Sequence, residues 1–200
     1  MGNHKLYLYP VWIRLWHVIN ALLCLILIIT GFVMHFETIF FDFETTVKVH
    51  NVAGVILLAN YLIFIFGNLV TTNGNHYTLE CKGLFKRIFV QIRYYSFGVF
   101  KGEETPYPTT EANKFNPVQQ ITYTMIMYGL LPILGLTGVA LLYPENILFN
   151  VLNIEGIVLI DIIHLIGGFF ILVFLIIHIY FSTMGEKIST HFKSIINGWH

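Results

Sequence analysis

The chain has 200 residues, of which 56% are hydrophobic and 11% charged, and its mean hydropathy is +0.72. So apolar a composition excludes a soluble domain of this length and indicates an integral membrane protein. The formal net charge of zero gives no reason to expect a nucleic-acid partner, and the two cysteines form no C-x-x-C-H motif for covalently attached haem.

Four segments are long and apolar enough to cross a bilayer. The first is too long for the apolar part of a signal peptide and no small-residue cleavage site follows it, so we expect it to stay in the mature protein. The sequence therefore predicts one domain over residues 1–200, an all-α bundle of four transmembrane helices. The predicted spans are residues 11–34, 47–70, 121–142 and 158–183.

The lysines and arginines fall almost entirely on one side of these spans. Of the eleven, only Lys48, at the outer end of span two, falls on the opposite side. By the positive-inside rule, both termini and the long loop of residues 71–120 are predicted to be cytoplasmic in a bacterial inner membrane. The outer connections carry acidic side chains, which either meet a partner or form a solvated rim: Glu37, Asp42, Glu44, Glu145, Glu155 and Asp161.

Two connecting segments have patterns of their own. Residues 82–100 mix basic and aromatic side chains at spacings that predict a helix lying in the cytoplasmic membrane interface, in contact with lipid. Residues 146–156, NILFNVLNIEG, are expected to form a short helix on the opposite membrane surface.

Four of the nine histidines lie within the predicted spans: His17, His50, His164 and His178. The fourteen residues from His164 to His178 make nearly four turns, so both imidazoles lie on one helix face, roughly 21 Å apart along the axis. Because the spans alternate in direction, His17 and His178 share the cytoplasmic level, and His50 and His164 share the outer level.

Two histidines that face each other across a bundle are the axial ligands that a six-coordinate haem b requires. The depth matching therefore predicts two haem b groups, held by His17 with His178 and by His50 with His164. Two other interpretations of these histidines stay open: hydrogen bonding between the helices of an inert bundle, and a histidine-based transition-metal transporter.

Other residues of the spans suit a flat macrocycle. Gly31, Gly54 and Gly168, with Gly167 beside it, would let the haems approach the helix backbone, although glycines also serve helix packing in general. Arg14 lies one turn before His17 and is a candidate partner for haem propionates. Its alternative role is that of an arginine that extends to the membrane interface.

Several motifs resemble one family. They are R-L-W-H at 14–17, H-N-V-A-G at 50–54, K-F-N-P-V-Q-Q at 114–120, T-G-V-A-L-L-Y-P at 137–144, and the H-x13-H of the fourth span. The chain resembles the di-haem cytochrome b subunits, of the cytochrome b561 type, that anchor nickel-iron hydrogenases, formate dehydrogenases and thiosulfate reductases. Its C-terminal tail looks most like the thiosulfate-reductase and multihaem-cytochrome-associated members.

The resemblance implies electron transfer across the membrane between the quinone pool and a periplasmic-side redox subunit of iron-sulfur or multihaem c type. It places menaquinone or ubiquinone beside the cytoplasmic haem, against the amides of Asn116, Gln119 and Gln120, whose alternative role is helix capping. No substrate-activating group is visible, so the chain is expected to be an electron-transfer subunit of an oxidoreductase complex. A free-standing haem enzyme that oxidises a species such as superoxide is the remaining alternative.

Overall fold

The computed structural model describes residues 6–36, 42–151, 153–184 and 188–199. Four of its helices are long and apolar enough to cross a membrane, and they agree with the predicted spans to within four residues at each end. They are α1 (Val11–His35), α2 (Phe43–Val70), the continuous helix of α4 (Pro117–Met125), η4 (Ile126–Leu130) and α5 (Leu131–Leu142), and α6 (Gly156–Ser182).

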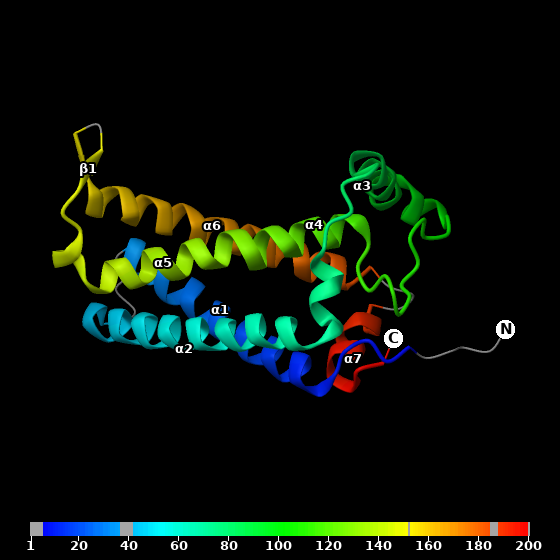
Figure 1. The fold of residues 1–200 in the computed structure, drawn as a ribbon, viewed down its shortest axis with the longest axis horizontal. Helices are drawn as coiled ribbons and strands as arrows, with labels where there is room; N and C mark the ends of the chain where they lie inside the picture. Colours follow the sequence, from blue (N-terminus) through cyan, green and yellow to red (C-terminus); the bar gives the residue numbers. More distant parts are fainter. Residues whose placement is uncertain (1–5, 37–41, 152, 185–187, 200) are drawn as a thin grey trace.

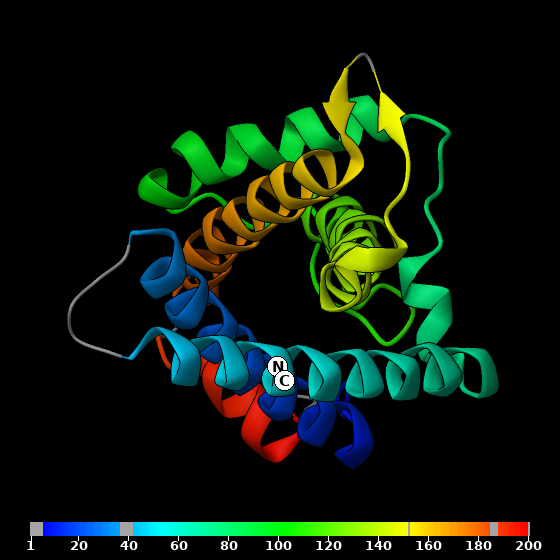
Figure 2. The same cartoon turned by 90° about the vertical axis from the view of Figure 1, so that its left-hand side faces the viewer.

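The four long helices form two antiparallel halves of one bundle. Helices α1 and α2 lie on one side, and α4, α5 and α6 lie on the other (Figures 1 and 2). Between them is a small core in which Trp16 stacks on Phe64 with ring centroids 4.4 Å apart. Many large apolar side chains on the long helices are exposed. This is the arrangement expected of helices whose outer faces meet lipid.

Local sequence signals explain how the third span begins and why it widens. Asn116 caps α4 with its side chain, Gln119 completes a capping box, and Pro117 occupies the first turn. Pro132 then lacks the N–H that an α-helix needs, and the helix takes a π-turn over the five residues before α5.

The two ends of the bundle differ (Figure 1). We call one the hairpin end, because it carries β1 (Asn150–Val151), β2 (Ile154–Glu155) and the turn η5 (Pro144–Asn146). The helix expected at residues 146–156 is therefore wrong. Asn153 has φ of 65°, a left-handed turn conformation, and the β-branched Val151 and Ile154 pair across the hairpin.

The other end, the loop end, carries both termini, residues 71–116 and α7 (Thr190–Asn197). Its loop contains η1 (Thr72–Tyr77), α3 (Leu84–Arg93), η2 (Tyr94–Gly98) and η3 (Val99–Lys101). The predicted helix within residues 82–100 is thus present. It lies across the direction of the long helices (Figures 1 and 2) and exposes Phe85 and Phe89 while Gln91 is buried. Its place in a membrane interface stays a prediction.

Candidate functional site

The structure brings together both histidine pairs that the sequence predicts. At the loop end, His17 on α1 faces His178 on α6 with ring centroids 6.2 Å apart and an interplanar angle of 48°. At the hairpin end, His50 on α2 faces His164 on α6, also at 6.2 Å, with an angle of 69°. Each pair joins the two halves of the bundle.

This separation fits a single metal ion between two imidazoles. A bond of about 2 Å from metal to nitrogen, with about 1 Å more from nitrogen to ring centre, puts two opposed rings about 6 Å apart. Within the described part of the chain, no group of three or more histidine, cysteine, aspartate or glutamate side chains could hold a metal ion. The histidines thus supply two ligands per site, which suits a porphyrin that brings four nitrogens of its own.

The hairpin-end pair is held by two threonines in matching ways. Thr30 Oγ1 lies 2.8 Å from His50 Nδ1 and 2.7 Å from the carbonyl oxygen of Ile26. Thr137 Oγ1 lies 2.9 Å from His164 Nδ1 and 2.8 Å from the carbonyl oxygen of Ile133.

The carbonyl contacts identify the tautomer of both rings. A carbonyl oxygen can only accept, so each threonine hydroxyl gives its one hydrogen to the helix and accepts from the histidine. We therefore assign the proton of His50 and of His164 to Nδ1, which leaves Nε2 free to bind iron. A ligand histidine usually has its second nitrogen fixed by a hydrogen bond in this way.

Each threonine is followed by a glycine that lies against the same ring, and the approach is tight at Gly138. A Cβ on Gly31 would lie 3.7 Å from Cε1 of His50, and one on Gly138 would lie 3.2 Å from Cε1 of His164. The prediction for Gly31 placed it at the level of this pair, and the structure does so. Sequence reasoning quoted Thr137 and Gly138 only as part of a family motif and gave neither threonine, nor Gly138, a role beside the histidines, although the dipeptide Thr-Gly recurs at 30–31 and 137–138 in two spans.

At the loop end the neighbours are aromatic. The hydroxyl of Tyr123, on α4, lies 3.2 Å from His178 Nδ1, and the ring of Phe174 stacks on that of His178 with centroids 5.5 Å apart. Lys114 Nζ lies 5.6 Å from the centre of the Phe115 ring, which in turn meets the Tyr123 ring edge-on. Sequence reasoning did not name Tyr123, and it quoted Lys114 only as the first residue of the family motif at 114–120.

The other predicted glycines have different surroundings. A Cβ on Gly54 would meet Leu27 of the neighbouring helix at 3.9 Å, and one on Gly167 would meet Leu134 at 2.8 Å. A Cβ on Gly168 would meet nothing within 4 Å. Close helix packing therefore explains Gly167, whereas the haem-facing role of Gly54 and Gly168 stays a prediction.

Arg14 lies where the two ends of the chain meet. Its Nη1 donates to the carbonyl oxygen of Ile196 in α7, and the backbone N–H groups of Leu8 and Tyr9 donate to Gly198 nearby. The guanidinium thus has a structural contact at the C-terminal end of a helix, where a cation is favoured. Its pairing with a propionate stays a prediction.

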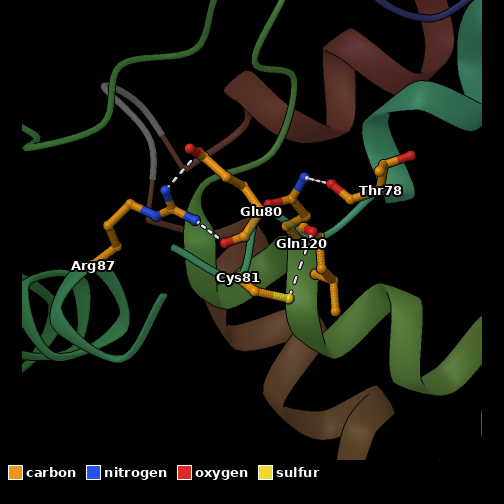
Figure 3. A network of polar contacts seen from close by, with 6 residues as sticks. Thr78, Glu80, Cys81, Arg87 and Gln120 are labelled. Carbon is orange, nitrogen blue, oxygen red and sulfur yellow. Dashed lines mark hydrogen bonds and ion pairs between the residues drawn. The ribbon is translucent and has the colours of Figure 1, made fainter. Parts of the chain in front are cut away.

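The three amides predicted to bind quinone lie at the start of α4, with Asn116 as the N-cap and Gln119 and Gln120 in the first turn. Asn116 accepts from the N–H of Gln119 at 3.0 Å and donates to the hydroxyl of Tyr95 at 2.7 Å. Gln120 donates to the carbonyl oxygens of His76 and Thr78, which ties α4 to the loop (Figure 3). All three side chains therefore have capping or loop contacts, and their role toward quinone is untested.

Facing histidines at two levels of a bundle of membrane-length helices are the arrangement of a membrane cytochrome. The family described as prokaryotic cytochrome b561 matches residues 8–198, and the chain belongs to it. The chain is 40% identical over 199 residues to "Putative cytochrome YdhU" of Escherichia coli (strain K12), covering 99% of this chain and 76% of that protein. No solved structure matches the chain.

Membership of this family confirms the predicted class. The protein is a multi-pass membrane cytochrome of the b561 type, and the family implies haem b and electron transfer across the membrane. The four-helix architecture predicted from the sequence is confirmed as well.

Proposed function

We propose that the chain holds two haem b groups, one at each histidine pair, and carries electrons across the membrane between a quinone and a redox partner. The observation that carries the proposal is the equal 6.2 Å separation of the two pairs, at opposite ends of α6. When bound, the haems supply one-electron chemistry. The chain holds them roughly 21 Å apart along α6, which is a span that electrons cross in short steps.

The donor set favours haem over a transported metal ion. Zinc and copper sites use three or four protein ligands, whereas each pair offers two imidazoles. At the hairpin end each ring also has a threonine hydroxyl at Nδ1, which places the proton there and leaves Nε2 unprotonated for a metal. A transporter needs ligands that exchange, and such fixed rings suit a resident cofactor better.

The orientation follows from the charges at the two ends. Lys82, Lys86 and Arg87 belong to the loop end, so we place that end in the cytoplasm of a bacterial inner membrane. Quinone would then react beside His17 and His178. The partner, an iron-sulfur or multihaem c-type subunit, would meet the hairpin end on the periplasmic side.

Haem counting tests this proposal. Purified wild-type protein should contain two b haems per chain, measured as the pyridine haemochrome. His17→Ala should retain one haem and lose quinol oxidation, and His50→Ala should retain the other haem. The matched control is His35→Ala, because His35 ends α1 outside both pairs.

Four results would contradict the proposal in whole or in part. A protein without haem would exclude the cytochrome function, and one haem per chain would exclude the second site. Loss of the hairpin-end haem from His17→Ala would refute the pairing. Purification as a stable single chain that reacts with superoxide would support the free-standing enzyme instead of the complex.

A further inference from the structure

A positive charge is buried beside the loop-end histidines. The Lys114 side chain is 5% exposed, and its Nζ donates to Asn73 Oδ1 at 3.3 Å. It also lies 4.3 Å from the centre of the Tyr9 ring. No ion pair among the residues that the structure describes includes Lys114. A buried ammonium without a carboxylate is costly, so an anionic partner is expected.

The surrounding phenols do not neutralise this charge. Burial raises the pKa of Tyr9 and of Tyr77 above the ordinary value, so both hydroxyls stay protonated. Burial also lowers the pKa of Lys114 to about 8, and the side chain is therefore still mostly charged at pH 7. The described residues thus leave a net positive charge in this part of the protein.

The lysine is held in place by a chain of buried amides. Asn73 Nδ2 donates to Asn68 Oδ1 at 2.7 Å, and Asn68 Nδ2 donates to the hydroxyl of Tyr128 at 2.8 Å. A Cβ on Gly74 would lie 2.6 Å from the carbonyl oxygen of Asn68, so only glycine fits the turn that presents Asn73. Such support indicates a built position and not a mobile surface lysine.

The position is linked to the loop-end pair through two aromatic rings. Lys114 Nζ lies 5.6 Å from the centre of the Phe115 ring, and that ring meets the Tyr123 ring edge-on with centroids 5.0 Å apart. The hydroxyl of Tyr123 in turn lies 3.2 Å from His178. An anionic oxygen of a group bound at this pair would therefore be near the ammonium.

We propose that Lys114 binds an anionic oxygen at the loop-end site, either the carboxylate of a haem propionate or the oxygen of a bound quinol. The inference rests on the proposed haem at His17 and His178. It assigns to Lys114 the propionate contact that the sequence suggests for Arg14, whose guanidinium contacts α7.

The test compares Lys114→Met and Lys114→Gln, which remove the charge, with Lys114→Arg, which keeps it. Lys101→Met is the matched control, because Lys101 is an exposed lysine of the same loop. Each protein is purified in detergent without quinone. Resonance Raman spectra of the propionate modes, the midpoint potential of the loop-end haem, and KM and kcat with menadiol are then measured.

A propionate partner predicts that the neutral variants shift the propionate band in the absence of quinone. It also predicts a fall in the midpoint potential, because loss of a cation favours ferric haem. We expect about a tenfold change in relative preference for the two oxidation states, which is about 59 mV for one electron. A quinol partner predicts a wild-type spectrum and potential with a KM for menadiol raised about tenfold.

Lys114→Arg should resemble the wild type in either case. Neutral variants with wild-type spectrum, potential and KM would overturn the inference. If neither neutral variant accumulates, the test rests on Lys114→Arg. A wild-type propionate band and a wild-type midpoint potential in this variant would support the requirement for a positive charge. Loss of the loop-end haem from it would overturn the inference. Wild-type protein without a haem that depends on His17 would instead overturn the proposed function.

Discussion

Thr137→Val removes a hydroxyl of the hairpin-end site with little change in volume. The hydroxyl accepts from His164 Nδ1 at 2.9 Å while it donates to Ile133. A donated hydrogen bond makes the imidazole a more basic ligand, and a more basic ligand favours ferric iron. The variant should therefore raise the midpoint potential of the hairpin-end haem.

The expected size follows from the hydrogen bond that is lost. An unpaired, partly buried N–H costs about 1–3 kcal/mol, of which we assign about 1 kcal/mol to the difference between the two oxidation states. Since 1.4 kcal/mol corresponds to about 59 mV for one electron, the shift should be about 40 mV. Thr30→Val acts on His50 across the same iron, so the double variant should shift about twice as far.

The assay is a redox titration followed at the α-band, with electron paramagnetic resonance of the ferric haems as a second signal. Thr137→Ser is the control, because serine keeps the hydroxyl and should keep the potential within about 10 mV. The loop-end haem, roughly 21 Å away along α6, should not respond in any of these variants. An unchanged hairpin-end potential in Thr137→Val, or an equal shift in Thr137→Ser, would refute the tautomer assignment.

Three further changes have defined outcomes. Gly138→Ala puts a Cβ 3.2 Å from Cε1 of His164 and should lower haem content at the hairpin end. Gly129→Ala is the control, because a Cβ there would meet nothing within 4 Å, and it should keep the wild-type haem content. Equal haem contents of the two variants in the pyridine haemochrome assay would contradict the role of Gly138 beside the His164 ring. Asn116→Ala should lower the free energy of unfolding by about 1 kcal/mol, and Asn116→Asp, which still caps α4, should not; equal thermal shifts would exclude the cap as the cause. The last change is a pH titration of His17→Ala. Burial lowers the pKa of Lys114 from 10.5 to about 8, so between these pH values the unfolded chain binds more protons than the folded chain, and the free energy of unfolding should rise with pH by up to about 3 kcal/mol. A flat thermal profile over this range, or the same rise in His17→Ala/Lys114→Met, would refute this reasoning.

The spans and the histidine pairs were accessible to sequence reasoning because both depend on depth alone. Apolar length gives each span, and the alternating direction of successive spans then gives each histidine a level. Only one way of pairing His17, His50, His164 and His178 matches the levels, and the structure has that pairing. The hairpin at residues 150–155 was missed because its signal is a single Asn153 turn inside an apolar segment.

The groups around the histidines were less accessible, because they depend on rotation about each helix axis as well as on depth. Thr30 and Thr137 look like ordinary polar residues of apolar spans until α1 is placed against α2 and α5 against α6. Lys114 illustrates the same limit, since in the sequence it is one of several loop lysines. In the folded protein Lys114 is covered by Asn73 of η1 and by Tyr9 of the segment before α1, and these contacts are not visible in the sequence.

The threonine contacts also indicate how the site assembles. Thr30 and His50 belong to the α1–α2 half of the bundle, and Thr137 and His164 belong to the half formed by α5 and α6. Each half therefore orients its own histidine through a contact within that half, whereas bonds from both histidines to one haem iron would join the halves. Because the rings are already fixed, haem binding loses little side-chain entropy at this end. The proposed hairpin-end site is thus best understood as two half-sites, each with its own histidine and threonine, that a shared haem would join.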